Sequence, residues 1–326
     1  MKTVLLAGGA GYIGSHTAKY LAGKGYRPVV FDDLSTGHAH SVKWGPLVRG
    51  NILDREALLT AFETHRPEAV MHFAALAYVG ESVLEPSKYY RNNVSGSLVL
   101  LDAMREAGIK RFVFSSSCAT YGTPATLPIT EECAQSPINP YGRSKLMVEE
   151  MLGDFDRAYG FPYVALRYFN AAGADPGTEI GEEHEPETHL IPLAIEAAQG
   201  RRAGITVYGT DYPTPDGTCV RDYVHVQDLA QAHHLAMEYL VRGGKSDAFN
   251  LGNGDGYSIR QILDAVAARS GGTFPVANSA RRPGDPPVLV GSAGKARAVL
   301  GWKPEFPALE DIIGTAWNWH GRNRGS

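Results

Sequence analysis

The sequence predicts an α/β fold in which a doubly wound parallel sheet, covered by helices on both faces, carries a smaller mixed α/β lobe toward the C-terminus. In the first half of the chain, short apolar runs alternate with stretches of helical period. The first apolar run leads directly into a glycine-rich turn, and the alternation stops after about Asn170. We therefore expect a sheet domain over residues 1–170 and a second lobe over residues 171–326.

The predicted strands are five apolar runs, with helices between them. The runs are KTVLLAG, YRPVVFDD, EAVMHFAA, KRFVFSSS and PYVALRYFN. Nearly continuous apolar strands are typical of a parallel sheet that is buried on both faces. The expected helices cover residues 13–24, 55–65, 89–107 and 141–159.

The second half has a different pattern. A loop-like stretch rich in Gly, Pro and Glu follows Asn170, and short strands and helices then alternate with long polar loops from Leu190 onward. Asp228 is expected to be the N-cap of a helix that ends near Arg242. The run AFNLGN is expected to be a strand, so that a segment over about 224–252 returns to the main sheet.

Composition narrows the functional classes. The chain has 326 residues, of which 44% are hydrophobic and 20% charged, and its net charge is -4. Basic residues occur singly or in pairs, so neither a nucleic acid nor an anionic membrane surface is an expected partner. No apolar run reaches the roughly 18 residues of a membrane span. Glycines interrupt the short N-terminal run, which argues against a signal peptide.

Cysteine and histidine usage points to a cytoplasmic protein without a metal site. Cys118, Cys133 and Cys219 are sparse and have no paired spacing, which fits a reducing compartment. The eleven histidines show no metal-ligand spacing. We therefore expect no bound metal.

The glycine turn predicts a dinucleotide site. Gly8, Gly11 and Gly14 form the pattern G-x-x-G-x-x-G between an apolar run and a predicted helix. This context allows a tight turn and lets a pyrophosphate approach the helix N-terminus closely.

Two carboxylates after the second apolar run indicate which dinucleotide is bound. Asp32 ends that run, where a carboxylate accepts hydrogen bonds from the adenosine ribose hydroxyls. Asp33 adds a second negative charge, and no Arg or Lys follows before Lys43. A ribose 2′-phosphate would meet uncompensated repulsion, so we expect NAD rather than its phosphorylated form.

The stretch NPYGRSKLMVEE places Tyr141 and Lys145 one helical turn apart, after a proline suited to a first turn. Alone, this spacing more often describes a phenol that lies on an aliphatic Lys stem, so it needs the context of other motifs. A Lys charge about 6 Å away, at an effective dielectric constant of about 20, favours the phenolate by roughly 3 kcal/mol, or about two pKa units. The phenol would then be able to accept a proton from a sugar or alcohol hydroxyl.

A serine run completes a recognisable set. Ser115, Ser116 and Ser117 end an apparent strand, where open α/β sheets build their sites. With the glycine turn, Tyr141 and Lys145, they resemble the catalytic set of the extended short-chain dehydrogenase/reductase family, which has a Rossmann-like sheet. Further motifs resemble its UDP-glucose 4-epimerases: GGAGYIGSH, FAALAYVGES, NNVSGSL, RYFNAAGA, YGTDYPTPDGTCVRDYVHVQDLA and RRPGD.

The resemblance implies a role for each member of the set. Ser117 would hydrogen-bond the substrate 4-hydroxyl, Tyr141 would be the base, and Lys145 would hold the nicotinamide ribose. The further cofactor contacts that it implies are Tyr12, Ile13, Asn51, Ile52, Phe73, Ala74, Ala75, Asn93 and Tyr168. The further substrate contacts that it implies are Phe169, Asn170, Leu190, Tyr208, Arg221, Tyr223, Arg282, Asp285 and Leu289.

The implied activity is the interconversion of UDP-galactose and UDP-glucose through a 4-keto intermediate, with tightly bound NAD, by a cytoplasmic homodimer of galactose metabolism. Family members with Tyr at the position of Leu289 tend to exclude N-acetylated sugars, so some turnover of these sugars is expected here. Two positions depart from the family pattern. Asn51 stands where Asp is frequent, and Ala77 stands where a Lys is found near the nicotinamide.

Besides another sugar-nucleotide epimerase of the same family, three alternatives stay open. Related sugar-nucleotide dehydratases and decarboxylases carry an acidic residue two places after the catalytic Ser or Thr, whereas Ser117 is followed by Cys118 and Ala119. A net dehydrogenase would accumulate NADH. A non-enzymatic nucleotide-sensing module would keep the glycines without needing Ser117, Tyr141 and Lys145.

Overall fold

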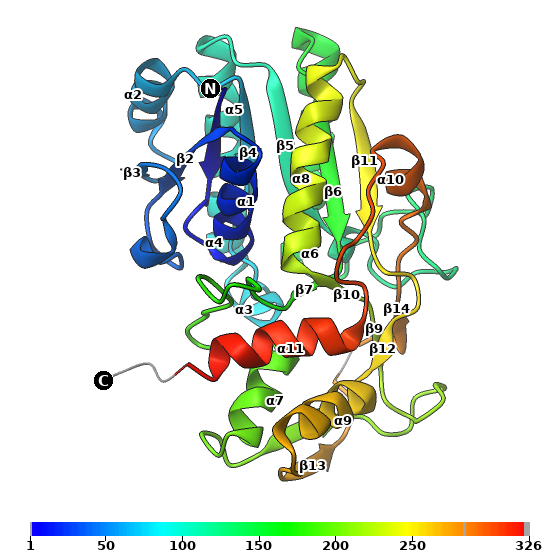
Figure 1. Ribbon diagram of the computed structural model, residues 1–326. Helices are drawn as coiled ribbons and strands as arrows, with labels where there is room; N and C mark the ends of the chain where they lie inside the picture. Colours follow the sequence, from blue (N-terminus) through cyan, green and yellow to red (C-terminus); the bar gives the residue numbers. More distant parts are fainter. Residues whose placement is uncertain (1, 283–284, 323–326) are drawn as a thin grey trace.

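The computed structural model describes residues 2–282 and 285–322, and its centre is a sheet of seven parallel strands (Figure 1). In sheet order the strands are β11 (Asp247–Leu251), β6 (Tyr163–Tyr168), β5 (Arg111–Ser117), β4 (Ala69–His72), β1 (Thr3–Ala7), β2 (Arg27–Asp32) and β3 (Leu47–Arg49). The strand order changes direction between β1 and β4, which is the switch point where doubly wound sheets bind ligands. The predicted fold class is confirmed.

Helices cover both faces of this sheet because side chains alternate along each strand. Leu6 points toward α1 (Tyr12–Gly23) and α8 (Val226–Val241), whereas its neighbour Leu5 points to the opposite face. That second face is covered by α2 (Arg55–His65), α5 (Gly96–Glu106) and α6 (Pro140–Tyr159). The apolar runs read as strands are therefore buried on both sides.

The expected helix over residues 89–107 is longer and less regular than predicted. It begins as α4 (Pro86–Tyr89), passes through a π-helical segment, η2 (Tyr90–Ser95), and continues as α5. A short helix, α3 (Val79–Leu84), precedes it. Strand β3 was not predicted, because three residues are too few to show a periodic pattern.

Asp228 is not the N-cap of α8, and that prediction is wrong. The helix begins at Val226, and the ring of His225 caps it by accepting a hydrogen bond from the Gln227 N–H at 3.1 Å. The buried carboxylate of Asp228 instead accepts the backbone N–H groups of Glu305 at 2.6 Å and Phe306 at 3.1 Å. A distant segment therefore uses the carboxylate that the local pattern assigned to the helix end.

The smaller lobe lies beyond the carboxyl ends of the main strands, in the lower part of Figure 1. Helices α7 (Leu190–Ala198), α9 (Ile259–Ser270) and α11 (Leu309–His320) share one apolar core there. The lobe strands form three small sheets: β7 (Asn170–Ala172) with β10 (Tyr223–His225), β8 (Ile205–Tyr208) with β13 (Val276–Ser279), and β9 (Val220–Arg221) between β12 (Tyr257–Ser258) and β14 (Val288–Leu289). The remaining elements are η1 (Ala39–Ser41), η3 (Cys118–Thr120) and α10 (Gly294–Val299).

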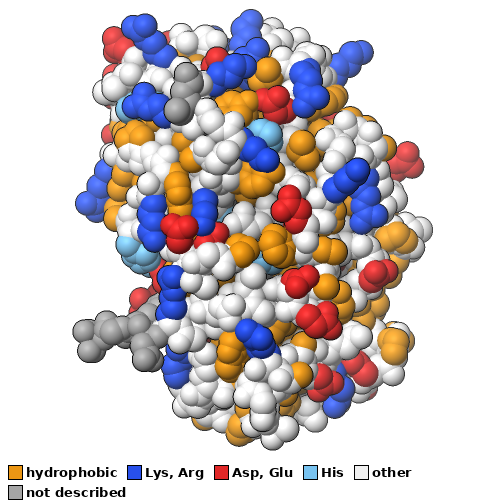
Figure 2. Space-filling view, in the orientation of Figure 1, with side chains coloured by type: hydrophobic (Ala, Val, Ile, Leu, Met, Phe, Trp, Pro, Cys, Tyr) orange, Lys and Arg blue, Asp and Glu red, His pale blue; other side chains and the backbone are white. Residues whose placement is uncertain are grey.

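The surface shows no strong separation of charge in the view of Figure 2, where acidic, basic and apolar side chains are interspersed. Within residues 2–282 and 285–322, no helix combines the length and apolar character needed to cross a bilayer. Strand β11 joins the main sheet beside β6, and α8, which precedes it in the chain, packs on one face of the same sheet.

Candidate active site

Packing within the chain requires glycine at two positions of the first turn, Gly8 and Gly14, but not at Gly11. Gly8 has a φ of +80°, and a Cβ there would lie 2.3 Å from the backbone nitrogen of Ala74. A Cβ at Gly14 would lie 2.4 Å from the Gly8 carbonyl oxygen. At Gly11 φ is −77° and a Cβ would meet only that oxygen, at an ordinary 3.5 Å. The chain's own packing therefore does not require Gly11 to be glycine, and the space beside it fits a group from outside, as a bound pyrophosphate would be.

Asp32 is held ready to accept further hydrogen bonds. Its two carboxylate oxygens accept the N–H groups of Ala10 and Leu34, each at 2.9 Å. Each oxygen keeps another lone pair, which fits a pair of ribose hydroxyls. Burial raises the pKa of Asp32, while the two N–H groups act in the opposite direction.

Asn51 is placed beside the second carboxylate. Its Nδ2 donates to Asp33 Oδ2 at 2.6 Å, and its Oδ1 accepts the Leu53 N–H at 2.9 Å. An Asp at position 51 would place two carboxylates in contact and remove this donor. The departure from the family pattern therefore neutralises a repulsion within the chain.

The predicted catalytic residues come together at the switch-point side of the sheet. Ser117 ends β5, while Tyr141 and Lys145 lie in the first two turns of α6. That helix begins at Pro140 because Asn139 caps it, with Oδ1 accepting the Gly142 N–H at 2.8 Å. The Ser117 hydroxyl lies close enough to the Tyr141 phenol to act on its pKa.

Lys145 does not contact the phenol directly. Its Nζ donates to the Ser115 carbonyl oxygen at 2.8 Å and lies 5.9 Å from the centroid of the Tyr141 ring. The hydroxyl of Tyr168, at the end of β6, is hydrogen-bonded to the side chain of Ser115, so Lys145 and Tyr168 contact the same residue.

The electrostatics differ from the sequence prediction. Burial raises the pKa of Tyr141 to about 12, although the neighbouring Ser117 hydroxyl acts in the opposite direction. Burial also lowers the pKa of Lys145 to about 7, against the attraction of Glu149. The predicted lowering of the Tyr141 pKa is therefore not found among the chain's own groups, because the loss of water disfavours the charged form of both side chains.

The loop after β4 borders the glycine turn. The N–H groups of Phe73 and Ala74 donate to the Ala7 carbonyl at 2.7 and 2.9 Å, which places Phe73, Ala74 and Ala75 at the switch point. Tyr12 and Ile13 begin α1 on the other side of that turn. Ile52 is buried after β3.

Asn93 is buried in the π-helical segment, and its amide is used within the chain. Its Oδ1 accepts from the Leu76 N–H and from Asn92 Nδ2, both at 2.9 Å. Its Nδ2 donates to the Leu76 carbonyl and to Ser144 Oγ, both at 3.0 Å. All four capacities of the amide are filled. Asn93 therefore positions the loop at Leu76 and the start of α6, and its amide has no capacity left for a direct cofactor contact.

The predicted substrate residues surround the carboxyl end of β6. Phe169 and Asn170 follow that strand, and Asn170 Nδ2 donates to the Asp222 carbonyl at 2.8 Å. Tyr223 is buried in β10, and Leu190 is the first residue of α7.

Two predicted substrate residues pair with each other. Arg221 and Asp285 form a salt bridge. Arg282 lies over the ring of Tyr208, with its guanidinium carbon 4.1 Å from the ring centroid. The two residues between Arg282 and Asp285 lie outside the described residues. Leu289 is opposite Arg221 in the register of β9 and β14, and it packs against the cluster of Tyr121, Ile129 and Phe169.

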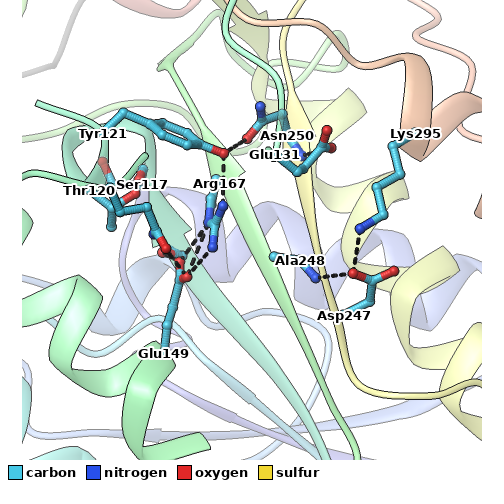
Figure 3. A network of polar contacts seen from close by, with 12 residues as sticks. Ser117, Thr120, Tyr121, Glu131, Glu149, Arg167, Asp247, Ala248, Asn250 and Lys295 are labelled. Carbon is cyan, nitrogen blue, oxygen red and sulfur yellow. Dashed lines mark hydrogen bonds and ion pairs between the residues drawn. The ribbon is translucent and has the colours of Figure 1, made fainter. Parts of the chain in front are cut away.

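A buried polar network beside the site was not predicted (Figure 3). Glu149 lies one turn after Lys145 on α6 and makes a salt bridge with Arg167 of β6, whose Nε donates to both carboxylate oxygens at 3.0 and 3.1 Å. Arg167 Nη1 also donates to Tyr121 Oη at 2.8 Å, which in turn donates to Asn250 Oδ1 at 2.8 Å. The i+4 spacing from Lys145 to Glu149 was a visible signal, but the partner on β6 was not.

The second unpredicted cluster lies in the loop before α7. Ligand-type atoms of Glu182, His184, Glu187 and His189 all lie within 4.8 Å of one another. Burial would lower the pKa values of both histidines, but the two carboxylates raise them to about 9 for His184 and about 10 for His189. The expectation of no metal rested on spacing along the chain, and it did not anticipate this cluster.

The comparisons with known proteins agree with this geometry. Residues 4–252 match the profile of the NAD dependent epimerase/dehydratase family. A UDP-glucose 4-epimerase of Rhizobium leguminosarum bv. trifolii is 56% identical over 99% of this chain and 98% of the relative.

Solved structures are similarly close over their full length. The Brucella ovis UDP-glucose 4-epimerase in complex with NAD has a TM-score of 0.97 and 57% identity, and covers 98% of this chain and 99% of its own. The Bifidobacterium longum enzyme in complex with NAD+ and UDP has a TM-score of 0.93 and 38% identity, with 99% of both chains covered. The chain thus belongs to the NAD dependent epimerase/dehydratase family and, within it, to the UDP-glucose 4-epimerases.

Proposed function

We propose that the chain inverts the configuration at C4 of a UDP-hexose, interconverting UDP-galactose and UDP-glucose, and that Ser117, Tyr141 and Lys145 carry the reaction. The observation that carries this proposal is that these three side chains meet at the carboxyl end of β5, on the same edge of the sheet as the glycine turn after β1, which leaves open space at Gly11. NAD, the cofactor of the family, supplies hydride acceptor and donor chemistry at the sugar C4 when it is bound.

Ser117 positions the reacting hydroxyl, and Tyr141 takes its proton. The two side chains lie close together, so a sugar hydroxyl that reaches both meets a donor and an acceptor. When the C4 configuration is restored on the other face, the phenol returns the proton.

Lys145 favours the phenolate through its charge. With a pKa of about 7, it is partly protonated near neutral pH. Burial weakens screening, so a positive charge lowers the energy of a phenolate more effectively here than it would in water. The same burial raises the pKa of the Tyr141 phenol. It also strengthens the effect of the Lys145 charge, which lowers that pKa.

The cofactor contacts follow the first half of the chain. Asp32 would accept hydrogen bonds from the adenosine ribose, and the first turn of α1 at Tyr12 and Ile13 would offer N–H groups to the pyrophosphate. The Asp33–Asn51 pair keeps a negative charge where a 2′-phosphate would lie. This arrangement supports NAD over the phosphorylated form.

The lobe holds the UDP-hexose. Tyr208 supplies a stacking ring, and Arg221 and Arg282 supply positive charge for the nucleotide, with Asp285 paired to Arg221. Leu289 lies at the sugar wall, against the cluster that contains Phe169. Leu is smaller than Tyr, so UDP-N-acetylglucosamine and UDP-N-acetylgalactosamine are minor substrates. Elimination of water lacks its acid, because Cys118 and Ala119 follow Ser117 and burial raises the pKa of Cys118 to about 12.

The assembly is proposed to be a homodimer in the cytoplasm. Apolar side chains of Val83, Leu84, Leu98 and Met147 are exposed on α3, α5 and α6, and that of Leu84 is 80% exposed. Helices α5 and α6 also contact each other, so a second copy would cover a continuous apolar surface. The cysteines Cys118, Cys133 and Cys219 carry free thiols, as a reducing compartment requires.

Incubation of the purified protein with UDP-galactose, without added NAD, tests the activity. We expect UDP-glucose to form until the two sugars reach equilibrium, without accumulation of NADH. Product that appears only in proportion to added NAD would identify a dehydrogenase, and a dehydrated sugar would identify a dehydratase. Bound nucleotide without any turnover would indicate a sensing module.

A further inference from the structure

The loop before α7 brings two histidines and two glutamates around one point. His189 Nδ1 lies 2.9 Å from Glu182 Oε1 and 2.8 Å from Glu187 Oε1. His184 Nδ1 lies 3.2 Å from Glu182 Oε1 and 3.7 Å from Glu187 Oε2. Each nitrogen therefore faces both carboxylates, which differs from two separate ion pairs.

The separations that use one oxygen of each glutamate are close to the edges of a metal tetrahedron, and all four ligand-type atoms lie within 4.8 Å of one another. Zinc bonds to His nitrogen and carboxylate oxygen of about 2.0–2.1 Å place neighbouring ligand atoms roughly 3.3 Å apart. The four nitrogen–oxygen distances lie on both sides of that value. Two imidazoles and two carboxylates are also a donor set that suits Zn²⁺ among the divalent metals.

One ligand atom lacks a satisfactory hydrogen bond. His184 Nδ1 is buried and has no hydrogen bond of sound geometry, although it is directed at two carboxylates. A cation between the four groups would give this nitrogen a partner. Two carboxylates balance the charge of one divalent ion when both imidazoles are neutral, so metal binding releases the imidazole protons to solvent.

The surroundings give the cluster a rigid frame. Glu182 is 4% exposed, and its carbonyl accepts from Trp319 Nε1 at 3.2 Å. The Pro186 carbonyl accepts from Tyr78 Oη at 3.2 Å, and the His184 ring lies 6.2 Å from that of Tyr12. The loop therefore bridges the glycine-turn side of the sheet and α11 of the lobe.

We propose that Glu182, His184, Glu187 and His189 bind one divalent transition-metal ion, with Zn²⁺ as the best-suited ion, in a closed four-ligand structural site. The ion holds the loop that joins the glycine-turn side of the sheet to α7. Because all four positions are filled by the protein, it takes no part in the chemistry at the sugar. The proposal does not depend on the activity, since metal content and stability report it directly.

The test uses untagged full-length protein, stripped with a chelator and then titrated with Zn²⁺ by calorimetry. We expect saturable binding of about one ion per chain and a higher melting temperature. His189→Gln should weaken binding at least about 100-fold, because even an outer-shell partner contributes roughly 10–100-fold. Glu187→Gln should do the same while preserving side-chain size.

His40→Gln is the matched control. Its imidazole is also exposed and contacts a glutamate, with Nε2 2.6 Å from Glu183 Oε2. It belongs to a separate group of ligand-type residues, His38, His40 and Glu183. This variant should bind Zn²⁺ like the unchanged protein. The proposal is overturned if the stripped protein takes up no more Zn²⁺ than His189→Gln, or if binding is lost in His40→Gln and kept in His189→Gln. Far-UV circular dichroism and NAD content verify that each variant is folded.

Discussion

Two buried cations beside helix α6 have opposite surroundings. Lys145 and Arg167 are 4% and 6% exposed. Lys145 donates to a backbone carbonyl, and burial lowers its pKa to about 7. Arg167 donates hydrogen bonds to both carboxylate oxygens of Glu149. This carboxylate raises the pKa of the guanidinium above its usual value, although burial acts in the opposite direction.

We infer that Lys145 keeps its charge for the proposed chemistry at Tyr141, whereas the charge of Arg167 serves the structure. The Arg167 network in Figure 3 satisfies its members, so it adds rigidity without an available proton. Lys145 has no such partner and can change protonation near neutral pH. Lys145 and Glu149 are one turn apart on the same helix, yet only Glu149 lies where β6 supplies an opposite charge.

The largest expected effect concerns the phenol of Tyr141, whose charged form Lys145 is proposed to favour. Tyr141→Phe should reduce kcat by about 10²–10⁴-fold, the usual range for a lost acid or base. UDP-sugar binding and the melting temperature should change little, because the ring and its packing remain. Steady-state kinetics, calorimetric UDP-sugar binding and thermal melts measure the three quantities. Near-normal turnover would remove Tyr141 from the mechanism.

Arg167→Met should lower the free energy of unfolding. It leaves Glu149 buried without its cation, which costs about 3–5 kcal/mol of unfolding free energy. The double variant Glu149→Leu/Arg167→Met should recover much of this loss. Arg157→Met is the control, because its ion pair with Asp154 is exposed and should contribute less than about 1 kcal/mol. Urea denaturation compares them, and equal losses in Arg167→Met and Arg157→Met would contradict a structural role for the network.

Lys145→Met should change how stability depends on pH. In the unfolded chain Lys145 keeps its proton up to its ordinary pKa of 10.5, whereas the folded chain loses it near 7. Between these values the unfolded state binds more protons, so the free energy of unfolding rises with pH, by at most about 1.4 kcal/mol per unit from this group. Urea denaturation from pH 7 to pH 9 should show this slope in the unchanged protein and a flatter one in Lys145→Met.

Parallel slopes would mean that Lys145 is charged in the folded protein at neutral pH. Activity supplies a second check on the same variant. Because the ammonium favours the phenolate, the residual activity of Lys145→Met should appear only at higher pH than in the unchanged protein.

The smallest effect is expected at Leu289, which lies near residues that adjoin both the catalytic set and the Arg167 network. This side chain packs in a cluster that includes Cys118, next to Ser117, and Tyr121, a partner of Arg167. Leu289→Tyr should reduce kcat/KM for N-acetylated UDP-sugars by about 10–200-fold, the 1–3 kcal/mol of a pocket change, and spare UDP-galactose. Kinetics with both sugar pairs decide this. Equal treatment of acetylated sugars by both proteins would mean that Leu289 only packs the lobe.

Local features of the chain were readable in the sequence. The predicted helix over residues 55–65 has those bounds as α2, and the five apolar runs are all strands of the main sheet. The glycine turn lies where the pattern placed it, between β1 and α1. These features depend on neighbours along the chain: periodicity, capping and turn residues act over a few positions.

Only the tertiary structure decided which polar groups find partners. Asp228 resembles a helix cap locally, but its carboxylate binds the backbone of residues 305 and 306. The pKa values of Tyr141 and Lys145 reverse the local expectation, because burial is a property of the whole fold. Arg167 meets Glu149 only because β6 and α6 pack together. Spacing along the chain states which side chains share a face, whereas desolvation and charge pairing depend on segments that lie far apart in sequence.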